Sequence, residues 1–453
     1  MHTHFPSGNG SDPGVGLLLA PFRGVRYDLS RVGGLANVTS PPYDVIGPGS
    51  IERLLAASRY NVVRLILPDA AGDAPDDVAP GDVAARRLDD WLAEGALATD
   101  DSPALYVYEQ RAADWVQRGL IGLVAVGTDA VHPHEGVMAG PVAGRRELMK
   151  KTRSNLEPIL LVYNGGSRLS GSETGAGGRS GLPAPGSASR LTDQIADSDP
   201  PLVHAVTDDG VTHRLWAVTD PGTQAAIAAD LATRTALIAD GHHRYAAYRD
   251  LRAEMSDEEG DPGPWDYGLA FLVDADEYPL RLGAIHRVLP RLSVTEAVDR
   301  ASQAFSVTRV DGGTAFDRLA KAGEAGVAFL LAGSSAGAGE WWLLTDPDRR
   351  QLDAAMPAGS SHRWRALDAS VMQELLFAQL WSIKDNERDV LISHDPEEAV
   401  RMAVDSGGTA VICNPMPLAA VMDIAAHGEK VPRKSTSFGP KPRTGLVLRM
   451  VDG

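Results

Sequence analysis

The stretch at residues 238–245 (IADGHHRY) constrains the local fold more than any other part of the chain. Residues 235–239 (TALIA) form a short apolar run of strand length, and Asp240 and Gly241 then interrupt it. From His243 onward the composition favours a helix. A strand that turns tightly into a helix presents unpaired backbone N–H groups and the positive end of the helix dipole to an anion. The pattern therefore predicts either a phosphate-binding loop or an ordinary capped helix.

Three side chains that can donate hydrogen bonds to a phosphate lie in this stretch, namely His242, His243 and Arg244. Asp240 is a favoured residue at a helix N-cap, and Gly241 lets the backbone approach a ligand closely. Adjacent histidines by themselves leave the two interpretations about equal. We therefore treat residues 240–244 as a candidate phosphate or nucleotide site whose assignment needs support from elsewhere in the chain.

Composition excludes several classes of protein. The chain has 453 residues, enough for two or three domains, and its net charge of −17 argues against a nucleic-acid binder, which must neutralise phosphates. A single cysteine, Cys413, excludes an internal disulfide framework and a cysteine zinc cluster. Residues 1–15 lack the charged and apolar regions expected of a secretory signal, and no apolar run reaches the roughly 18 residues that a membrane helix needs. We expect a cytoplasmic protein with no membrane partner; the sequence does not determine its oligomeric state.

Short apolar runs that alternate with amphipathic stretches predict a mixed α and β fold, either α+β or mixed α/β. We expect a disordered tail at 1–15, an N-terminal α/β region at 16–290 and a C-terminal α/β region at 291–453. Residues 164–190 are rich in Gly, Ser and Pro, so they predict a flexible surface insertion. Residues 256–264 predict a second, acidic loop.

The spacing of the apolar residues along the chain predicts the individual strands and helices. The expected strands are 16–21, 62–67, 105–109, 119–126, 159–163, 327–332, 341–345, 410–414 and 445–450. The expected helices are 51–58, 83–94, 191–199, 294–305, 367–381 and 418–427.

Residues 40–46 (SPPYDVI) combine two rigid prolines with an aromatic side chain and a carboxylate. Consecutive prolines fix φ and impose an extended backbone, so Asp44 is held in place without help from other side chains. Asp44 is a candidate general base or Mg²⁺ ligand. The alternative is a turn that precedes the helix expected at 51–58.

Residues 132–135 (HPHE) carry three possible metal ligands, but two histidines do not complete a zinc site. Mg²⁺ prefers oxygen ligands, which makes Glu135 the better candidate for a phosphoryl-transfer site, as a metal ligand or a catalytic carboxylate. A basic cluster follows in a helix-forming stretch at residues 145–153. It is either a solvated face or a surface that faces a substrate.

Residues 432–441 (PRKSTSFGPK) form a second candidate anion-binding segment. Their ammonium and hydroxyl groups suit phosphate or carboxylate oxygens, and we single out Lys434, Ser435, Thr436 and Lys441. The glycine spacing of a Walker loop is absent, and the alternative is a basic surface loop. Arg287, at the end of a strand-like stretch, is a further candidate phosphate ligand.

Several blocks of the chain together resemble one family, the bacterial and archaeal domain-of-unknown-function family 1015. The matching blocks are 20–24, 40–46, 60–67, 134–135, 155–163, 213–216, 238–245, 286–287 and 434–446. The chain departs from the family at 142–145, where it reads Val-Ala-Gly-Arg and many relatives have a Lys-x-Asp-Arg pattern. This departure puts an acid or base role for that segment in doubt.

The Asp-Gly-His-His-Arg loop also resembles the phosphate-binding loop of the ParB/sulfiredoxin superfamily, which includes free-serine kinases. This resemblance implies a ParB/sulfiredoxin-like core elaborated by additional mixed sheets. It also implies that Gly241, His242, His243 and Arg244 hold nucleotide phosphates.

Three functions follow as hypotheses. The first is a kinase that uses ATP or ADP with Mg²⁺ to phosphorylate a small hydroxylated metabolite, with free L-serine the leading candidate; Asp44, Glu135 and His243 are its expected catalytic residues. The second is a nucleotide-binding regulator that transfers no phosphate. The third is a metal-dependent hydrolase built on His132, His134, His242 and His243.

Overall fold

The computed structural model describes residues 16–72, 78–166, 186–259, 262–335, 338–384, 386 and 388–451. The expected tail at 1–15 and residues 167–185 of the expected insertion lie outside the described residues. The chain divides into two compact units. Unit 1 comprises residues 1–132, 137–280 and 440–453, and unit 2 comprises residues 133–136 and 281–439.

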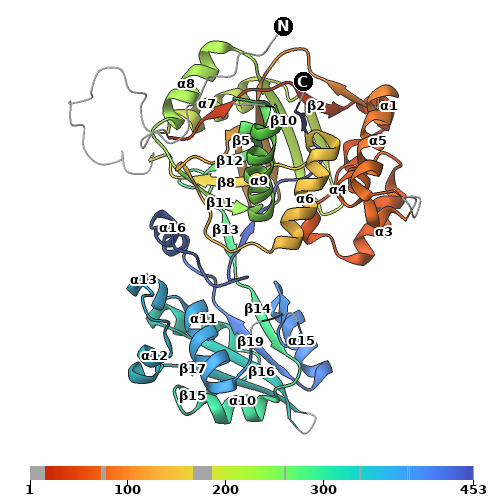
Figure 1. Cartoon of the computed structure of the whole chain (residues 1–453). Coiled ribbons are helices and arrows are strands. Elements are labelled where there is room, and N and C mark those ends of the chain that lie inside the picture. Colours follow the sequence, from red (N-terminus) through yellow and green to blue (C-terminus); the bar gives the residue numbers. More distant parts are fainter. Residues whose placement is uncertain are drawn as a thin grey trace, which may run out of the picture. The chain divides into compact units, whose positions relative to one another are not determined.

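Unit 1 is built on a nine-stranded mixed sheet with the order β6-β11-β8-β12-β5-β4-β10-β9, to which β1 is added by pairing with β5 (Figure 1). The pairs β6–β11 and β8–β12 are parallel and the others are antiparallel. The strands are β1 Leu19–Ala20, β4 Leu105–Arg111, β5 Val116–Ala125, β6 Val131–His132, β8 Ile159–Tyr163, β9 Val203–Val206, β10 Thr212–Val218, β11 Ala236–Asp240 and β12 Tyr267–Asp274.

The central strands of this sheet are buried on both faces. All eight residues of β12 and all five of β8 are buried, which explains why both read as continuous apolar runs instead of alternating ones. Helices α6 (Ala139–Thr152) and α9 (His242–Glu259) pack against each other over one face of the sheet (Figure 1). Helices α7 (Ser187–Ser198) and α8 (Pro221–Leu231) also pack against each other.

The two ends of the chain meet in a second sheet of unit 1. It has the order β3-β2-β21-β7, with β2 Gly24–Tyr27, β3 Leu97–Thr99, β7 Ser154–Asn155 and β21 Leu448–Met450. The surrounding helices are α1 Leu29–Val32, α2 Leu35–Val38, α3 Pro48–Ala57, α4 Val63–Ile66 and α5 Pro80–Ala93. Because the C-terminal strand pairs between β2 and β7, the segment after residue 440 belongs to unit 1.

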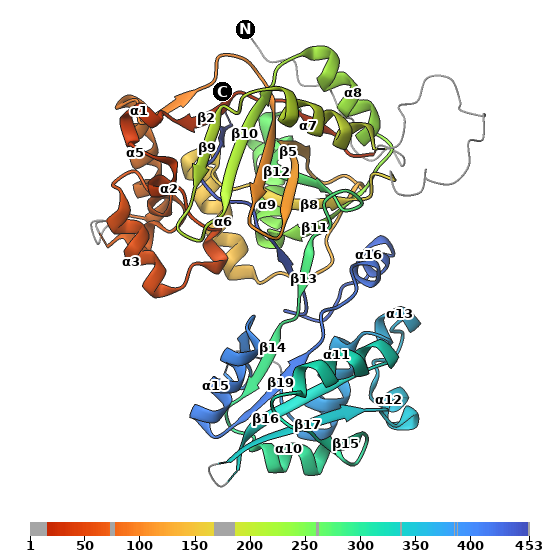
Figure 2. The same cartoon turned by 180° about the vertical axis from the view of Figure 1, so that it is seen from behind.

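Unit 2 contains a six-stranded antiparallel sheet with the order β15-β17-β16-β19-β14-β18 (Figure 2). Successive residues of β16 belong to different apolar clusters, with Phe329 and Leu331 in one and Leu330 and Ala332 in the other. Alternate side chains of a strand face opposite sides of a sheet, so both faces of this sheet are covered. Its strands are β14 His286–Leu289, β15 Ser306–Arg309, β16 Phe329–Ser335, β17 Ala338–Thr345, β18 Leu391–Ser393 and β19 Thr409–Cys413.

Within the described residues, seven α-helices, the π-helix η5 (Met372–Trp381) and one two-stranded ribbon complete unit 2. The ribbon pairs β13 Arg281–Gly283 with β20 Ser437–Gly439. The α-helices are α10 Val294–Ala301, α11 Ala315–Ala325, α12 Arg349–Ala355, α13 His362–Arg365, α14 Asp368–Val371, α15 Pro396–Ser406 and α16 Leu418–Ala426.

The structure confirms the mixed α and β class and corrects several elements. The strand expected at 62–67 is the helix α4, whose N-terminus is held by the buried Asn61. The Asn61 side chain accepts a hydrogen bond from the Val63 N–H (3.0 Å) and donates to the Asn37 carbonyl (2.8 Å). Tertiary packing of the two valines therefore overrides their strand propensity.

Three further predicted elements differ from the structure in their bounds or in their type. Helix α9 runs to Glu259, so the acidic loop expected at 256–264 is helical at its start. Helix α7 begins at Ser187, so the expected insertion ends before residue 190. The helix expected at 367–381 is α14 followed by a π-helix, η5 (Met372–Trp381). No helix in the described part of the chain is both long and apolar enough to cross a membrane.

Replacing Asn61 by alanine tests whether its side chain stabilises the helix α4. We expect Asn61→Ala to lower the free energy of unfolding by about 1–3 kcal/mol, because buried polar groups that bond to Asn61 lose their partner. Urea unfolding followed by fluorescence measures the change. Asn37→Ala is the matched control at an exposed position, with an expected change within about 0.5 kcal/mol. Equal effects of the two substitutions would contradict this assignment.

Candidate functional site

The turn between β11 and α9 is formed as the sequence predicts. All residues of β11 are buried, and Gly241 follows with a φ of +95°, in the left-handed region. A Cβ atom on Gly241 would lie 2.8 Å from Ile159 Cγ2 and 3.2 Å from Arg244 Nε. Glycine is therefore required here both by the backbone conformation and by the space available. The helix begins at the next residue, His242.

Two cations hold the Asp240 carboxylate. Arg244 Nη2 lies 2.5 Å from one of its oxygens, and Lys441 Nζ lies 2.6 Å from the other. Arg244 is only 1% exposed and also donates to the Pro158 carbonyl. Burial lowers the pKa of Arg244, but neighbouring carboxylates, Glu157 first, more than offset this and raise it. Arg244 is thus a buried, permanently charged group behind the turn.

Lys441 also pairs with Asp44, at 3.0 Å, and so bridges two carboxylates. Asp44 lies in the short 3₁₀ turn η1 (Tyr43–Val45) that follows the two prolines. Burial raises the pKa of Asp44, but the Lys441 ammonium and the Arg244 guanidinium outweigh this effect and lower it overall. The Asp44 side chain is 35% exposed and that of Asp240 only 8%, so Asp44 is the carboxylate of this pair that a ligand can reach.

Backbone pairing brings Asp44 and Lys441 together. Ser40 and Thr444 exchange two backbone hydrogen bonds, of 3.1 and 2.8 Å, which align the two segments antiparallel. The Arg443 side chain then donates to Thr39 Oγ1 at 2.7 Å. The predicted Pro-Pro-Tyr-Asp segment and the last residue of the predicted C-terminal segment are therefore fixed side by side.

A buried glutamate that the sequence reasoning did not single out completes the cluster. Glu157 Oε1 accepts hydrogen bonds from the Tyr43 N–H (3.0 Å) and the Thr444 hydroxyl (3.2 Å). Burial raises its pKa, against the effects of Arg244 and Arg145. The signal in the sequence is an acidic residue directly before Pro158 and a buried strand.

Two arginines lie over the Tyr43 ring. The guanidinium carbon of Arg145 is 4.4 Å from the ring centroid, and that of Arg244 is 5.8 Å from it. Arg145 also donates to the Ile66 carbonyl at 2.7 Å. This residue of the predicted basic cluster therefore faces the site instead of solvent. We define the charge cluster of unit 1 as Asp44, Arg145, Glu157, Asp240, Arg244 and Lys441.

The two histidines at the start of α9 differ in their surroundings. His242 is buried, and His243 is half-buried. His243 Nε2 accepts a hydrogen bond from the Met138 backbone N–H at 3.1 Å, so the neutral ring carries its proton on Nδ1. Nε2 of His243 is thus hydrogen-bonded to the backbone of the segment that leads into α6.

The other predicted site residues lie in unit 2, where Glu135 supports the loop at 433–436. Its carboxylate accepts the Lys434 backbone N–H at 2.6 Å, and Lys434 has a φ of +54°. His134 Nε2 and the Thr436 hydroxyl are 2.9 Å apart. Burial raises the pKa of Glu135, against the effect of Lys434. These contacts hold the shape of the loop.

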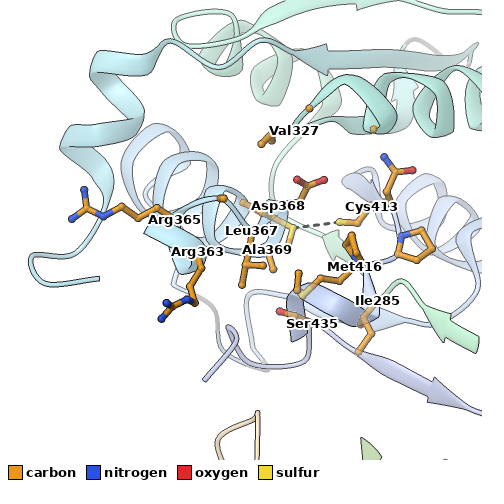
Figure 3. Close-up of a pocket in the computed structure, with 18 of the residues that line it drawn as sticks. Ile285, Val327, Arg363, Arg365, Leu367, Asp368, Ala369, Cys413, Met416 and Ser435 are labelled. Atoms are coloured by element: carbon orange, nitrogen blue, oxygen red, sulfur yellow. Dashed lines mark hydrogen bonds between the residues drawn. The ribbon is translucent and has the colours of Figure 1, made fainter. Parts of the chain in front are cut away.

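Arg287 supports the same loop from strand β14. It is 2% exposed and donates to the carbonyls of Ile285 (2.9 Å), Arg433 (3.1 Å) and Lys434 (2.8 Å). Arg287 and Ser435 both line a cavity of about 580 Å³ in unit 2 (Figure 3). The predicted residues thus form two sets, one in each unit.

Among the residues that the structure describes, no group of three His, Cys, Asp or Glu side chains is arranged to hold a metal ion. The hydrolase hypothesis therefore finds no ligand set in the described chain. A magnesium ion bound here would depend on substrate phosphates for most of its ligands, as is common for this ion.

The chain belongs to the family described as "Protein of unknown function (DUF1015)", whose model matches residues 19–172 and 182–370. This confirms the family resemblance seen in the sequence. No curated protein matches the sequence.

Solved structures similar to this chain include free serine kinase in complex with AMP, with 13% identity and a TM-score of 0.32; the match covers 69% of this chain and 84% of that one. A point mutant of free serine kinase in complex with ADP matches with 13% identity and a TM-score of 0.33, over 69% and 84%. A C-terminally truncated SbnI from Staphylococcus aureus matches with 11% identity and a TM-score of 0.35, over 73% and 87%. At these TM-scores the likeness is distant.

Removing the bridging lysine tests the charge cluster. We expect Lys441→Met to lower the free energy of unfolding at pH 7 by about 2–3 kcal/mol, less than for a fully buried pair because Asp44 is partly exposed. Since the pKa of Asp44 is lowered in the folded protein, its stabilising effect is present above the ordinary pKa of an aspartate, about 3.9, and is lost as the pH falls through the folded pKa. The difference between the two proteins should therefore shrink on acidification below about pH 4.

Urea unfolding at several pH values measures this difference. Lys151→Met is the control, because Lys151 pairs with Asp82 at 2.9 Å with both side chains exposed, and we expect no measurable change. The bridge would be contradicted if Lys441→Met lowered the free energy of unfolding only as much as Lys151→Met does, or by the same amount at every pH.

Proposed function

We propose that this DUF1015 protein is a nucleotide-dependent phosphotransferase that acts on a small hydroxylated metabolite, with free L-serine the first candidate. The observation that carries the proposal is the position of Lys441, 3.0 Å from Asp44 and 2.6 Å from Asp240. It joins a candidate base to the turn predicted to bind phosphate. Serine comes first because the sequence of the loop resembles that of the free-serine kinases.

The phosphate site of the proposal is the turn at Gly241 and the first turn of α9. The helix dipole contributes only about 0.3–2 kcal/mol to anion binding, so other positive charge is needed. Lys441 is 20% exposed and supplies charge that a phosphate can contact. Arg244 adds a second charge from behind Gly241, and its Nε, beside that glycine, has no hydrogen-bond partner among the described residues. Backbone N–H groups and these cations together suit a phosphate.

Asp44 is the proposed general base. Its lowered pKa keeps it ionised at neutral pH, so it can accept the proton of an acceptor hydroxyl. A low pKa makes a weak base, but phosphoryl transfer passes through a loose transition state in which positioning and charge neutralisation matter most. The prolines before η1 and the bond to Lys441 provide that positioning. His243, with one ring nitrogen bound to Met138, is proposed to orient a phosphate oxygen.

The proposal includes Mg²⁺ with ATP or ADP as co-substrate. The ion would neutralise the phosphates, which would also supply most of its ligands. We assign Glu135, Lys434, Ser435, Thr436 and Arg287 to the stability of the unit 2 loop, because Glu135 and Arg287 already bond to its backbone.

A nucleotide-binding regulator is the second candidate. Asp44, the proposed base, is already paired with Lys441 at 3.0 Å, which favours a site that binds a nucleotide without taking up a proton. Such a protein would bind a nucleotide without consuming it. The two candidates therefore differ in turnover and not in binding.

Neutralising Asp44 distinguishes them. We expect purified protein with Mg²⁺, ATP or ADP, and serine or a panel of hydroxylated metabolites to form a phosphomonoester detectable by mass spectrometry. Asp44→Asn should lower kcat on the order of 10²–10⁴-fold, the usual contribution of a positioned acid or base. Its Kd for the nucleotide, measured by calorimetry, should change by less than about threefold, or roughly 0.7 kcal/mol.

Asp82→Asn is the matched control, since Asp82 also pairs with a lysine, Lys151, but lies outside the cluster. It should leave kcat unchanged. Nucleotide binding without any phosphorylated product would favour the regulator. Absence of nucleotide binding would contradict both candidates.

A further inference from the structure

Unit 2 contains a cavity that plays no part in the proposed phosphoryl transfer. Its volume of about 580 Å³ lies in the range of about 300–1,000 Å³ typical of small-molecule sites. Most of its lining is apolar, including Ile285, Leu367, Met372 and Met416. Figure 3 shows the carboxylate of Asp368 among the lining residues, with Cys413 beside it. An apolar cavity with few polar groups is the usual form of a ligand site.

The Asp368 carboxylate lacks a cationic partner among the residues that the structure describes. In the described chain, the carboxylate accepts a hydrogen bond from the backbone N–H of Ala328. Burial raises its pKa to about 6, because the ionised form is poorly solvated there. A carboxylate placed in an apolar cavity is costly to the fold unless something pairs with it.

The cations around the cavity are engaged elsewhere. Arg287 donates to three backbone carbonyls, and Arg363 pairs with Asp423 (3.2 Å) and Glu429 (2.8 Å). Arg365 donates to Ser360. In Figure 3 the side chains of Arg363 and Arg365 extend away from Asp368. Asp368 is therefore the group of the lining that has no cation paired to it among the described residues, and a ligand cation can pair with it.

Local structure supports a binding role. Asp368 opens α14, which continues directly into the π-helix η5, and Met372 at the start of η5 lines the cavity. π-Helical turns are rare and occur often at functional sites. Met372 and Met416 add flexible, polarisable side chains that adapt to the shape of an apolar ligand.

We propose that this cavity binds a small apolar molecule that carries a primary amine, with its ammonium group paired to Asp368. The apolar part of the ligand occupies the space between Met372, Met416 and Leu367. The proposal concerns unit 2 alone and stands whether or not unit 1 transfers phosphate.

Affinity for the amine depends on pH through Asp368. With a pKa of about 6, this carboxylate is mostly ionised at pH 7 and mostly protonated at pH 5, so the amine should bind about tenfold more weakly at pH 5. The other charged or titratable side chains that line the cavity are Arg287, Arg363, Arg365, Asp423 and Cys413. Burial raises the pKa of Cys413 to about 12, so its thiol stays neutral in this range.

Methyl NMR on the full chain with ¹³C-labelled methionine tests the proposal, since the chain has ten methionines and two of them line the cavity. The probes are 2-phenylethylamine and tryptamine, compared with the matched alcohols 2-phenylethanol and tryptophol and the matched acids 3-phenylpropanoate and indole-3-propanoate. We expect the amines to shift the Met372 and Met416 signals and to bind at least tenfold more tightly than the alcohols and acids. Met→Leu variants assign the two signals.

Asp368→Asn should abolish both this preference and the dependence on pH. Asp423→Asn is the control, because it removes another carboxylate of the lining and should keep both. Ala420→Phe, which fills the cavity from α16 and leaves Asp368 in place, should block binding even if Asp368→Asn fails to fold.

Three results would overturn the proposal. One is equal binding of amines, alcohols and acids. Another is unchanged amine binding in Asp368→Asn or in Ala420→Phe. The third is no shift of either methyl signal by the amines up to about 10 mM, where even weak millimolar binding is visible.

Discussion

The candidate site of unit 1 depends on one interaction, the bridge that Lys441 makes between Asp44 and Asp240. Both carboxylates lie within 3.0 Å of the Lys441 ammonium, whose positive charge offsets the repulsion between two like charges in a partly buried site. Because the lysine is 397 residues from Asp44 in sequence, the bridge also closes the fold of unit 1. The strand β21, which follows Lys441, pairs with β2 and β7 and fixes the lysine in place.

The pairing of opposite charges in the charge cluster of unit 1 explains why its side chains can be buried. Arg244 and Glu157 are almost completely buried, and each needs opposite charge nearby. Arg145 and Arg244 both lie over Tyr43, so the aromatic ring shares in the stabilisation of the cations. A bound phosphate would add negative charge to a balanced cluster. We therefore infer that it binds together with a metal ion.

Local patterns predicted the parts of this site that are formed by neighbours in sequence. The apolar run before Asp240, the glycine and the helical composition after it specify the strand, turn and helix, and the structure has all three. The two prolines likewise specify the rigid approach to Asp44. Family resemblance drew attention to the same segments, and the match of the family model confirms the resemblance itself.

Local patterns in the sequence did not predict the contacts between residues that lie far apart in the chain. The partners of Asp240, Glu135 and Arg287 come from distant segments, so the sequence indicated which residues are charged and not which way they point. The sequence predicts a strand at residues 62–67 because three of them are valine or isoleucine, which favour strands. The structure has a helix there because these residues pack in the buried surroundings of Asn61. The cavity around Asp368 is lined by several separate segments, and no pattern in any one of them predicts it.

The most direct measurement of the central claim is a ³¹P NMR time course of the protein with Mg²⁺, a nucleotide and a hydroxylated acceptor. We expect the terminal phosphate signal of the nucleotide to decline while a phosphomonoester signal of the acceptor grows in equal amount. A spectrum that stays unchanged, or one in which only inorganic phosphate grows, would contradict phosphoryl transfer to a metabolite.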